Sequence, residues 1–413
     1  MSPGQPATVL LIGTLDTKGA EISYLQQRIC ETGLATLVLD SGILGEPVGI
    51  VPDIPRAAVA RAAGHELQQI RRAGSRGAAV ELMMKGVAAV CRDLYVQGSC
   101  QGVVSLGGAE GAVLANAGMQ VLPVGVPKLI VSPLASGQRQ FGPFVGIRDV
   151  MVMHSVVDIL GLNSVSRLIF DQAAGAIAGA VHRMTANAPP PPLEPRRVVA
   201  LTMLGNTTTA IESLKPLLEA RGYEPIIFHS NGVGGAAMEE MIRERRIGAV
   251  IDYTTDELTD HLVGGYHDAG PRRLEAAGDA GIPQVVLPGC VDFFVQGARA
   301  NLPAVWRDRP AYYHNPTFTL LRATRAEMLE VARRMAAKLN QARGPVTVVV
   351  PTQGLSIPNT PGGPFWDPPC DEAFRAQLRQ RLHDRIHYIE VDAHINSIDT
   401  VDTVARAFFD TAS

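Results

Sequence analysis

Residues 8–24 read TVLLIGTLDTKGAEISY and combine a strand pattern, a glycine and a helix start. The apolar, β-branched run at 9–12 is typical of a strand that is buried on both faces. Gly13 ends this run, and Asp16 or Thr17 can accept a backbone N–H bond and so cap a helix. Apolar residues then recur at helical spacing as far as residue 29. The stretch therefore predicts a strand, a tight turn and a helix.

The turn of this unit is suited to an anion. Backbone N–H groups and the positive end of the helix dipole point to whatever lies above the carboxyl end of the strand. Lys18 adds a positive charge at the same place. The sequence is neither a GxGxxG fingerprint nor a full Walker A motif, because the second glycine before the lysine is missing. An ordinary strand–helix turn with a surface lysine is the alternative interpretation.

Strand patterns alternate with helix patterns along the whole chain. A proline-rich stretch at 187–195 interrupts them and is typical of an interdomain linker. Before it, apolar residues at helical spacing predict helices from about residue 150 and again over 164–184. After it, Thr324 and Glu327 form a capping box that predicts a helix start. Strands are expected at 9–12, 35–40, 102–106, 127–131, 196–204, 225–229, 249–253, 284–287, 346–350 and 386–391.

This alternation predicts an α/β protein with two Rossmann-like, doubly wound domains and largely parallel sheets. A chain of 413 residues is longer than one hydrophobic core usually serves. We expect the first domain at 1–186, the linker at 187–195 and the second domain at 196–413. In such sheets, ligands bind beyond the carboxyl ends of the strands, near the point where the strand order reverses.

Composition narrows the class of protein. The formal net charge is only −3, and no basic tract is interleaved with aromatic residues, so we do not expect nucleic acid as a partner. The five cysteines form no Cys-x-x-Cys pair and are expected to be reduced thiols. The chain starts without a signal-peptide pattern and contains no apolar run long enough to span a bilayer. These features predict a cytoplasmic protein with no membrane partner.

A second glycine loop follows the strand expected at 102–106. Gly107, Gly108 and Gly111 lie at the end of that strand and open a helix, as Gly13 does for the first strand. Two such loops on neighbouring parallel strands can face one ligand from both sides. Together with Lys18 they predict a phosphate-bearing ligand. The alternative is that the glycines only permit a tight turn and close packing.

Several motifs, in order, make the sequence resemble the Tm-type ATP-binding family. In the first half these are GTLDTK at 13–18, GVPKLIVS at 125–132, ASG at 135–137 and SVVDI at 155–159. In the second half they are FHSNGVGG at 228–235, DYTTDEL at 252–258 and YHNP at 313–316. The resemblance covers nearly the whole chain. It implies two Rossmann-like subdomains, ATP with Mg²⁺ bound by the first of them, and a homodimer or higher oligomer.

The resemblance and the loops together define the expected nucleotide site, with turnover of ATP left open. One departure concerns the second loop, where the family pattern is GGSGGT and this chain has GGAEGA at 107–112. Both hydroxyls are absent, and the Glu110 carboxylate would repel a phosphate by more than about 1 kcal/mol unless a cation intervenes. Weaker ATP binding or a different ligand would follow. The residues expected to bind the nucleotide are Gly13, Thr14, Asp16, Thr17, Lys18, Gly107, Gly108, Gly111, Ser136 and Gly137.

The second half supports a different class of function. His229, Asp252 and His314 are candidate catalytic residues of a small-molecule lyase or hydrolase with its site in the interdomain cleft. The first domain would then be a scaffold, and a non-catalytic interaction module is a third hypothesis. Cys290 is either a thiolate nucleophile, activated by one of the two histidines, or a small buried residue.

No metal site is predicted from the histidines. His383 and His387 have the spacing of His-Glu-x-x-His, but a strand is expected to begin at Ile386, which would separate the two imidazoles. His261 and His267 flank two glycines and are expected to be polar loop residues rather than ligands.

Overall fold

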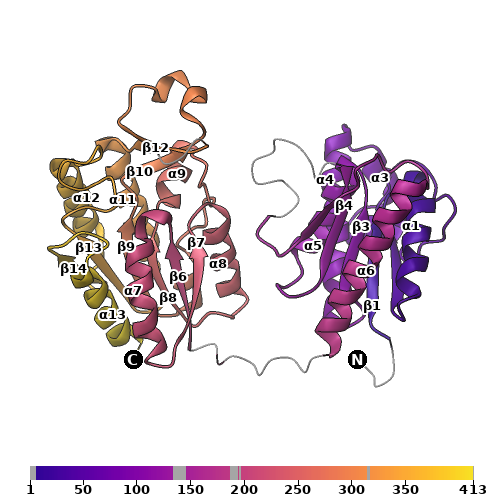
Figure 1. Ribbon diagram of the computed structural model, residues 1–413, viewed down its shortest axis with the longest axis horizontal. Helices are drawn as coiled ribbons and strands as arrows, with labels where there is room; N and C mark the ends of the chain where they lie inside the picture. The colour runs from indigo at the N-terminus through magenta and orange to yellow at the C-terminus, as the bar shows by residue number, and fades with distance from the viewer. Residues whose placement is uncertain (1–5, 134–145, 187–193, 195–196, 314–316, 413) are drawn as a thin grey trace. The chain divides into compact units, whose positions relative to one another are not determined.

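The computed structural model of the chain describes residues 6–133, 146–186, 194, 197–313 and 317–412. Two compact units make up the chain, residues 1–190 and residues 191–413. Each unit is an α/β layer structure with its own sheet, as Figure 1 shows. The predicted fold class is confirmed: two α/β units with mostly parallel sheets.

The first unit contains a five-stranded sheet in the order β2-β1-β3-β4-β5. All neighbouring strands pair in parallel. Because β2 and β3 lie on opposite sides of β1, the chain reverses direction across β1, and the switch point lies between β1 and β3. The strands are β1 (Thr8–Gly13), β2 (Ala35–Asp40), β3 (Gly102–Leu106), β4 (Lys128–Ser132) and β5 (Met151–His154).

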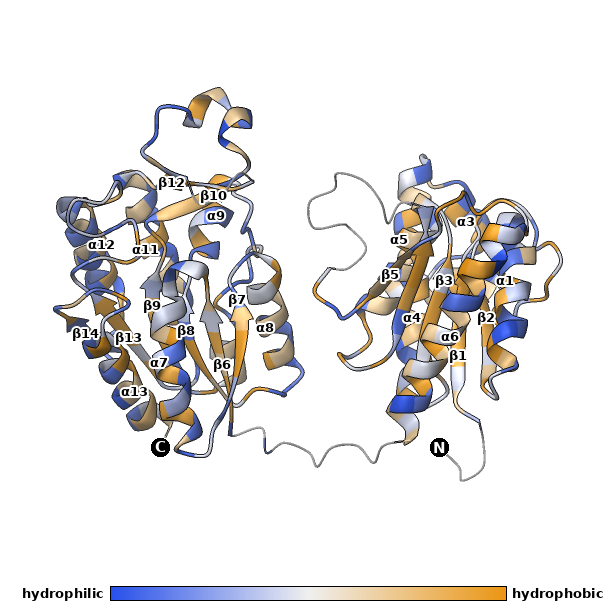
Figure 2. Ribbon diagram, viewed as in Figure 1, coloured by the Kyte–Doolittle hydropathy of each residue, from blue (hydrophilic) through white to orange (hydrophobic). Residues whose placement is uncertain are grey.

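Alternate residues of the strands bury against helices on the two faces of this sheet. Val9 and Leu11 pack with α1 and α6, whereas Leu10 and Ile12 pack with α2, α4 and α5. The orange strands in Figure 2 reflect this burial on both faces. The helices are α1 (Leu15–Cys30), α2 (Arg56–Ala62), α3 (Leu67–Arg71), α4 (Arg76–Val96), α5 (Ala109–Gln120) and α6 (Ser164–Ala186).

The second unit repeats the arrangement with six parallel strands in the order β14-β13-β9-β8-β6-β7. Its switch point lies between β6 and β8. The strands are β6 (Val198–Met203), β7 (Glu224–His229), β8 (Ala249–Thr254), β9 (Gln284–Gly289), β13 (Val346–Pro351) and β14 (His387–Val391). The helices are α7 (Thr208–Glu219), α8 (Val233–Arg243), α9 (Glu257–Val263), α10 (Ala276–Ala280), α11 (Arg325–Leu339), α12 (Pro368–Arg381) and α13 (Ile398–Ala412).

The sequence did not reveal two features of these units. The apolar residues from about 150 form β5, an edge strand, rather than a helix, because Met151 to His154 pair with β4 in parallel register. The second unit also carries a small antiparallel sheet that packs on the Cys290 and Phe365 side chains. Its strands are β10 (Phe293–Gln296), β11 (Ala311–Tyr313) and β12 (Thr319–Arg322).

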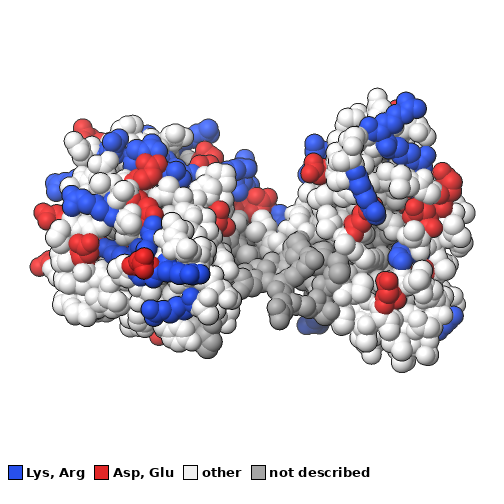
Figure 3. All heavy atoms as spheres, turned by 90° about the horizontal axis from the view of Figure 1, so that it is seen from above, with Lys and Arg blue, Asp and Glu red and all other residues white. Residues whose placement is uncertain are grey.

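Two properties of the described residues bear on possible partners. No helix in the described part of the chain combines the length and the apolar character that crossing a membrane requires. Figure 3 shows basic and acidic side chains interspersed on one face of the second unit, in keeping with the net charge of −3.

Candidate functional site

A cavity of about 1090 Å³ lies in the first unit, at the switch point between β1 and β3. The loop after β1 contributes one wall and the start of α5 another, while α4 and residues 42–44 close the sides. The structure therefore brings together the two loops that the sequence singled out. The predicted residues that line the cavity are Thr14, Asp16, Thr17, Lys18, Gly108 and Gly111.

The remaining predicted residues have other positions. Gly13 lies where a Cβ would come within 2.8 Å of Ile22, so the glycine lets β1 approach α1. Gly107 lies where a Cβ would come within 3.0 Å of the Gly111 Cα, so it lets the first turn of α5 close over the end of β3. Ser136 and Gly137 lie outside the described residues.

The start of α5 presents backbone donors to the cavity. Gly108 is the N-cap residue and supplies no side-chain cap. The N–H groups of Ala109, Glu110 and Gly111 have no hydrogen-bond acceptor within the described ranges, as expected for the first turn of a helix. All three residues line the cavity. An anion in the cavity can therefore accept hydrogen bonds from this turn and interact with the positive end of the helix dipole.

Lys18 is held differently from a mobile surface lysine. Its backbone has φ −126° and ψ 15°, which interrupts the first turns of α1. Its ammonium group donates to the Ile159 carbonyl oxygen. Nearby, the Glu21 carboxylate accepts the Gly161 N–H at 2.7 Å. Lys18 thus contributes a positive charge to the cavity and also ties residues 159–161 to α1.

Glu110 also has a partner that the sequence did not indicate. The Arg76 guanidinium approaches the Glu110 carboxylate, with its Nη2 at 2.5 Å and its Nε at 2.7 Å from Oε2. Arg76 begins α4, and its side chain is 81% exposed. The pair places a cation beside the carboxylate, which reduces the repulsion that Glu110 alone would exert on a phosphate.

Asp40 at the end of β2 joins two loops that contribute residues to the cavity lining. It is fully buried, and Arg56 donates to its Oδ2 at 2.6 Å. Its Oδ1 accepts the N–H groups of Leu15 at 3.3 Å and Gly42 at 2.9 Å. The carboxylate therefore joins the loop after β2 to the loop after β1. The only sequence signal for this role is an acidic residue at a strand end.

In the second unit, the carboxyl ends of β6, β7 and β8 meet at a buried polar network. Arg273 is 1% exposed and forms a bidentate pair with Asp252 at 2.5 and 2.6 Å. It also donates to Glu257 at 2.5 Å. Burial lowers the pKa of Arg273, but the charges of Asp252 and Glu257 outweigh that effect and raise it well above its usual value. Burial raises the pKa of Glu257.

A second part of this network contains Asp256, Asp260 and His267. His267 Nδ1 lies 2.8 Å from Asp256 Oδ2. Burial raises the pKa of Asp260 to about 8, although the charge of His267 opposes this effect. Burial lowers the pKa of His267, but the hydrogen bond and charge of Asp256 outweigh it, so the net direction is upward. His267, which the sequence suggested to be a polar loop residue, is 8% exposed.

The candidate catalytic residues occupy different environments. Asp252 is buried and enclosed by Arg273 and by Thr202, whose Oγ1 donates to it at 2.8 Å. His229 lies at the end of β7, and partial desolvation of its ring, together with the charge of His267, lowers its pKa. His314 lies outside the described residues.

Cys290, His383 and His387 have the positions of ordinary structural residues rather than of nucleophiles or metal ligands. Cys290 is fully buried, and burial raises the pKa of its thiol well above the usual value, which is the opposite of nucleophile activation. Helix α12 ends at Arg381 and β14 begins at His387, so His383 and His387 do not share a helix face.

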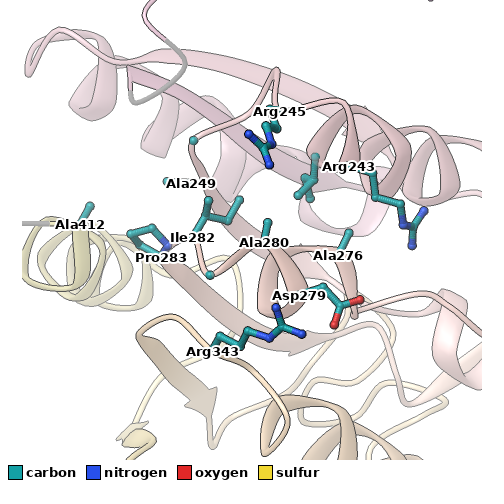
Figure 4. Close-up of a pocket in the computed structure, with 13 residues that line it drawn as sticks. Arg243, Arg245, Ala249, Ala276, Asp279, Ala280, Ile282, Pro283, Arg343 and Ala412 are labelled. Atoms are coloured by element: carbon teal, nitrogen blue, oxygen red, sulfur yellow. The ribbon is translucent and has the colours of Figure 1, made fainter.

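Another cavity, of about 1020 Å³, lies in the second unit at the amino ends of strands β8 and β9 (Figure 4). Gly248 and Pro283, which line it, immediately precede β8 and β9. Arg343 and Asp279 point toward one another in this view. Helices α8 and α10 both end here, and the negative ends of their dipoles account for the neighbouring arginines. The switch-point cavity is therefore the better candidate for a functional site.

Both units match models of one protein family. Residues 7–186 match the N-terminal domain and residues 196–412 the C-terminal domain of the uncharacterised protein family UPF0261. A UPF0261 protein of Clostridium tetani is 38% identical over 400 residues, which cover 96% of this chain and 97% of that protein. A UPF0261 protein of Brucella suis is 36% identical over 401 residues, which cover 97% and 94%.

A plant protein is also similar. The ToMV resistance protein Tm-1(GCR237) of Solanum lycopersicum is 32% identical over 338 residues. The aligned region covers 81% of this chain and 45% of the plant protein. The similarity therefore concerns less than half of the plant protein.

Proposed function

The chain belongs to the uncharacterised protein family UPF0261, and we propose that its first unit binds ATP together with Mg²⁺ in the cavity between β1 and β3. The observation that carries the proposal is the meeting of two strand-end loops at the switch point of a doubly wound sheet. A volume of about 1090 Å³ is slightly above the range of about 300–1,000 Å³ that small-molecule pockets usually occupy.

The polar groups of the lining suit the phosphates. The N–H groups at the start of α5 are donors there, whereas the Thr17 hydroxyl already donates to the Thr14 carbonyl oxygen at 3.3 Å and lies 3.2 Å from the Thr14 hydroxyl. Lys18 and Arg76 supply positive charge. Arg76 is paired with Glu110, so a phosphate would compete with that carboxylate for the guanidinium. Removal of the Glu110 charge should therefore strengthen binding.

The apolar residues of the lining suit the base. Ile43, Leu44, Val80, Met84 and Val113 present apolar surface. An adenine ring can pack on such a surface while the phosphates lie at the helix start.

Mg²⁺ fits the acidic residues of the same cavity. Asp16 accepts the Gly45 N–H with Oδ2, and no other bond to its carboxylate is found among the described residues. Magnesium prefers oxygen ligands and binds through one or two carboxylates plus substrate phosphates. Asp16 and Glu81, which both line the cavity, would hold the ion, which offsets the negative charge of the polyphosphate.

Thermal unfolding of the full chain with ATP and Mg²⁺ tests the proposal. Ligand at about a hundred times its dissociation constant stabilises the native state by roughly 2.7 kcal/mol, which is on the order of 5–10 °C in melting temperature. Arg76→Ala should reduce the shift, and Glu110→Gln should enlarge it because Arg76 is then free to meet the phosphates. Arg92→Ala, on the exposed face of the same helix, is the matched control and should leave the shift unchanged.

The choice of ligand separates the parts of the proposal. The thermal shifts with ADP, AMP and adenosine, each with Mg²⁺, measure how much binding depends on the number of phosphates. The shift with inorganic pyrophosphate and Mg²⁺ measures binding without the base. Absence of a shift with ATP in the wild type and in Glu110→Gln contradicts the nucleotide proposal, and a shift with pyrophosphate alone would replace it with a simpler anion site. The oligomer that the family resemblance implies is tested by light scattering of the same samples.

A further inference from the structure

Three potential metal ligands meet inside the second unit. Asp256, Asp260 and His267 each offer one ligand atom, and these atoms all lie within 4.8 Å of one another. Asp256 is the N-cap residue of α9, Asp260 lies four residues later on the helix, and His267 follows in the next loop. All three residues are buried. The cluster lies near the carboxyl end of β8, which ends at Thr254.

Hydrogen bonds hold the two aspartate side chains in place but leave one of their carboxylate oxygens without a donor. The Asp256 Oδ1 accepts from Ser230 Oγ at 2.6 Å. The Asp260 Oδ1 accepts the N–H groups of His267 at 3.0 Å and Val295 at 3.1 Å. The ligating groups are therefore oriented by neighbours, as metal ligands usually are.

One oxygen of this cluster has no partner. The Asp260 Oδ2 is buried and accepts no hydrogen bond from any described residue. A buried carboxylate oxygen that lacks a partner bears the full cost of its lost hydration. Protonation would not remove the defect, because the new O–H would itself need an acceptor. A cation bound next to Oδ2 would satisfy it.

The basic side chains of this region already have carboxylate partners. Arg273 donates to Asp252 and Glu257, and His267 contacts Asp256 through Nδ1. With Glu257 adjacent in sequence, three buried carboxylates lie within five residues of α9 and its cap. Carboxyl groups so close together pair more favourably with a further cation than with a neutral ligand.

The ligand types indicate which cation. An imidazole nitrogen with two carboxylates suits zinc or manganese, whereas magnesium and calcium prefer oxygen ligands alone. His229 ends β7 at the same edge of the sheet, so a second imidazole is present at this edge.

We propose that Asp256, Asp260 and His267 bind one divalent transition-metal ion, of the zinc or manganese class, in the second unit. This site is separate from the ATP site proposed for the first unit. Its test needs no nucleotide, so either proposal can fail without the other.

The test compares metal binding by the full-length protein and two matched variants. Asp260→Asn keeps an oxygen at the Oδ1 position for the two backbone N–H groups and replaces Oδ2 by an amide nitrogen, which is not a metal ligand. Asp292→Asn is the control, because Asp292 is another fully buried aspartate with one unpartnered oxygen but no place in the cluster. Each protein is stripped with chelator, incubated with Zn²⁺, Mn²⁺ or Co²⁺, desalted and analysed for metal.

We expect the wild type and Asp292→Asn to retain one ion per chain and to gain thermal stability from it. Asp260→Asn should lose both effects. His267→Gln, which can still donate to Asp256, serves if Asp260→Asn does not fold, and it should lose the visible Co²⁺ absorption of the wild type. Equal metal content in the wild type and in these cluster variants, or no retained metal in any of them, overturns the proposal.

Discussion

At the scale of single residues, Asp292 is a buried carboxylate whose ionisation opposes folding. It is fully buried, its Oδ2 accepts from Ser356 Oγ at 2.7 Å, and its Oδ1 has no partner within the described chain. Burial raises the pKa of Asp292 to about 6, with the Arg322 charge opposing the shift and the Asp371 charge adding to it. The native state therefore holds this proton at pH values where the unfolded chain has released it.

This raised pKa predicts a pH dependence of stability. Because the native state binds the proton more tightly, the stabilisation is fully present below the unfolded pKa of 3.8 and is lost as the pH rises through about 6. Asp292→Asn removes the titration, so between about pH 4 and pH 7 the wild type should lose up to roughly 3 kcal/mol relative to the variant. Urea unfolding of both proteins across this range measures the difference. A difference in unfolding free energy that does not change with pH would contradict the assignment.

At the scale of elements, α1 packs very closely against the loop that follows β2. A Cβ on Gly19 would lie 1.8 Å from the Val48 carbonyl oxygen, so only glycine fits at this crossing. The Val48 N–H also donates to the Leu15 carbonyl at 3.0 Å. The same loop supplies residues 42–44 of the cavity wall, so the position of α1 and the shape of the cavity are coupled.

Gly19→Ala tests this coupling. The added methyl group must push the loop away from α1, and we expect the first unit to lose about 1–3 kcal/mol of stability, as overpacked sites do. The ATP-dependent thermal shift should fall as well, because the displaced loop carries part of the cavity wall. Gly175→Ala is the control. Gly175 is exposed on α6 with open space around its Cα, so alanine should stabilise that helix by up to about 1 kcal/mol and leave ligand binding unchanged. If Gly19→Ala is as stable as the wild type, the close approach of Gly19 to the Val48 carbonyl is contradicted.

At the scale of the whole molecule, each unit has its own hydrophobic core. The clusters that bury the first sheet contain only residues up to 181, and those that bury the second sheet begin at residue 198. Each unit also has a complete doubly wound sheet. Such units fold alone when their cores are separate.

We therefore expect residues 1–190 and 191–413, expressed separately, each to unfold cooperatively in a thermal melt. The ATP shift should stay with the first fragment and the metal-dependent shift with the second, because the residues of each proposed site lie within one unit. Circular dichroism and calorimetry of the two fragments provide the measurement. A fragment that remains unfolded, or a ligand shift found only in the intact chain, would show that the units depend on each other.

The sequence by itself determined the parts of this protein that depend on local patterns. Buried strand segments such as 9–12 are apolar along their length, and the capping box at Thr324 and Glu327 marks the start of α11, where both reciprocal bonds form. The two glycine loops could be identified because strand, glycine and helix start are contiguous in sequence. The alternation of these elements was enough to predict two doubly wound units.

Only the tertiary structure decided which side chains meet. Arg76 and Glu110 are 34 residues apart, and Lys18 donates to a carbonyl 141 residues away, so no local pattern marks either contact. Edge strand β5 has helix-like spacing of apolar residues, and its conformation is set by pairing with β4. The burial of His267 beside Asp256 and Asp260 depends on how the loop after α9 folds back over that helix. Packing between distant elements fixes such contacts, because their distances depend on the relative placement of whole strands and helices rather than on neighbouring residues.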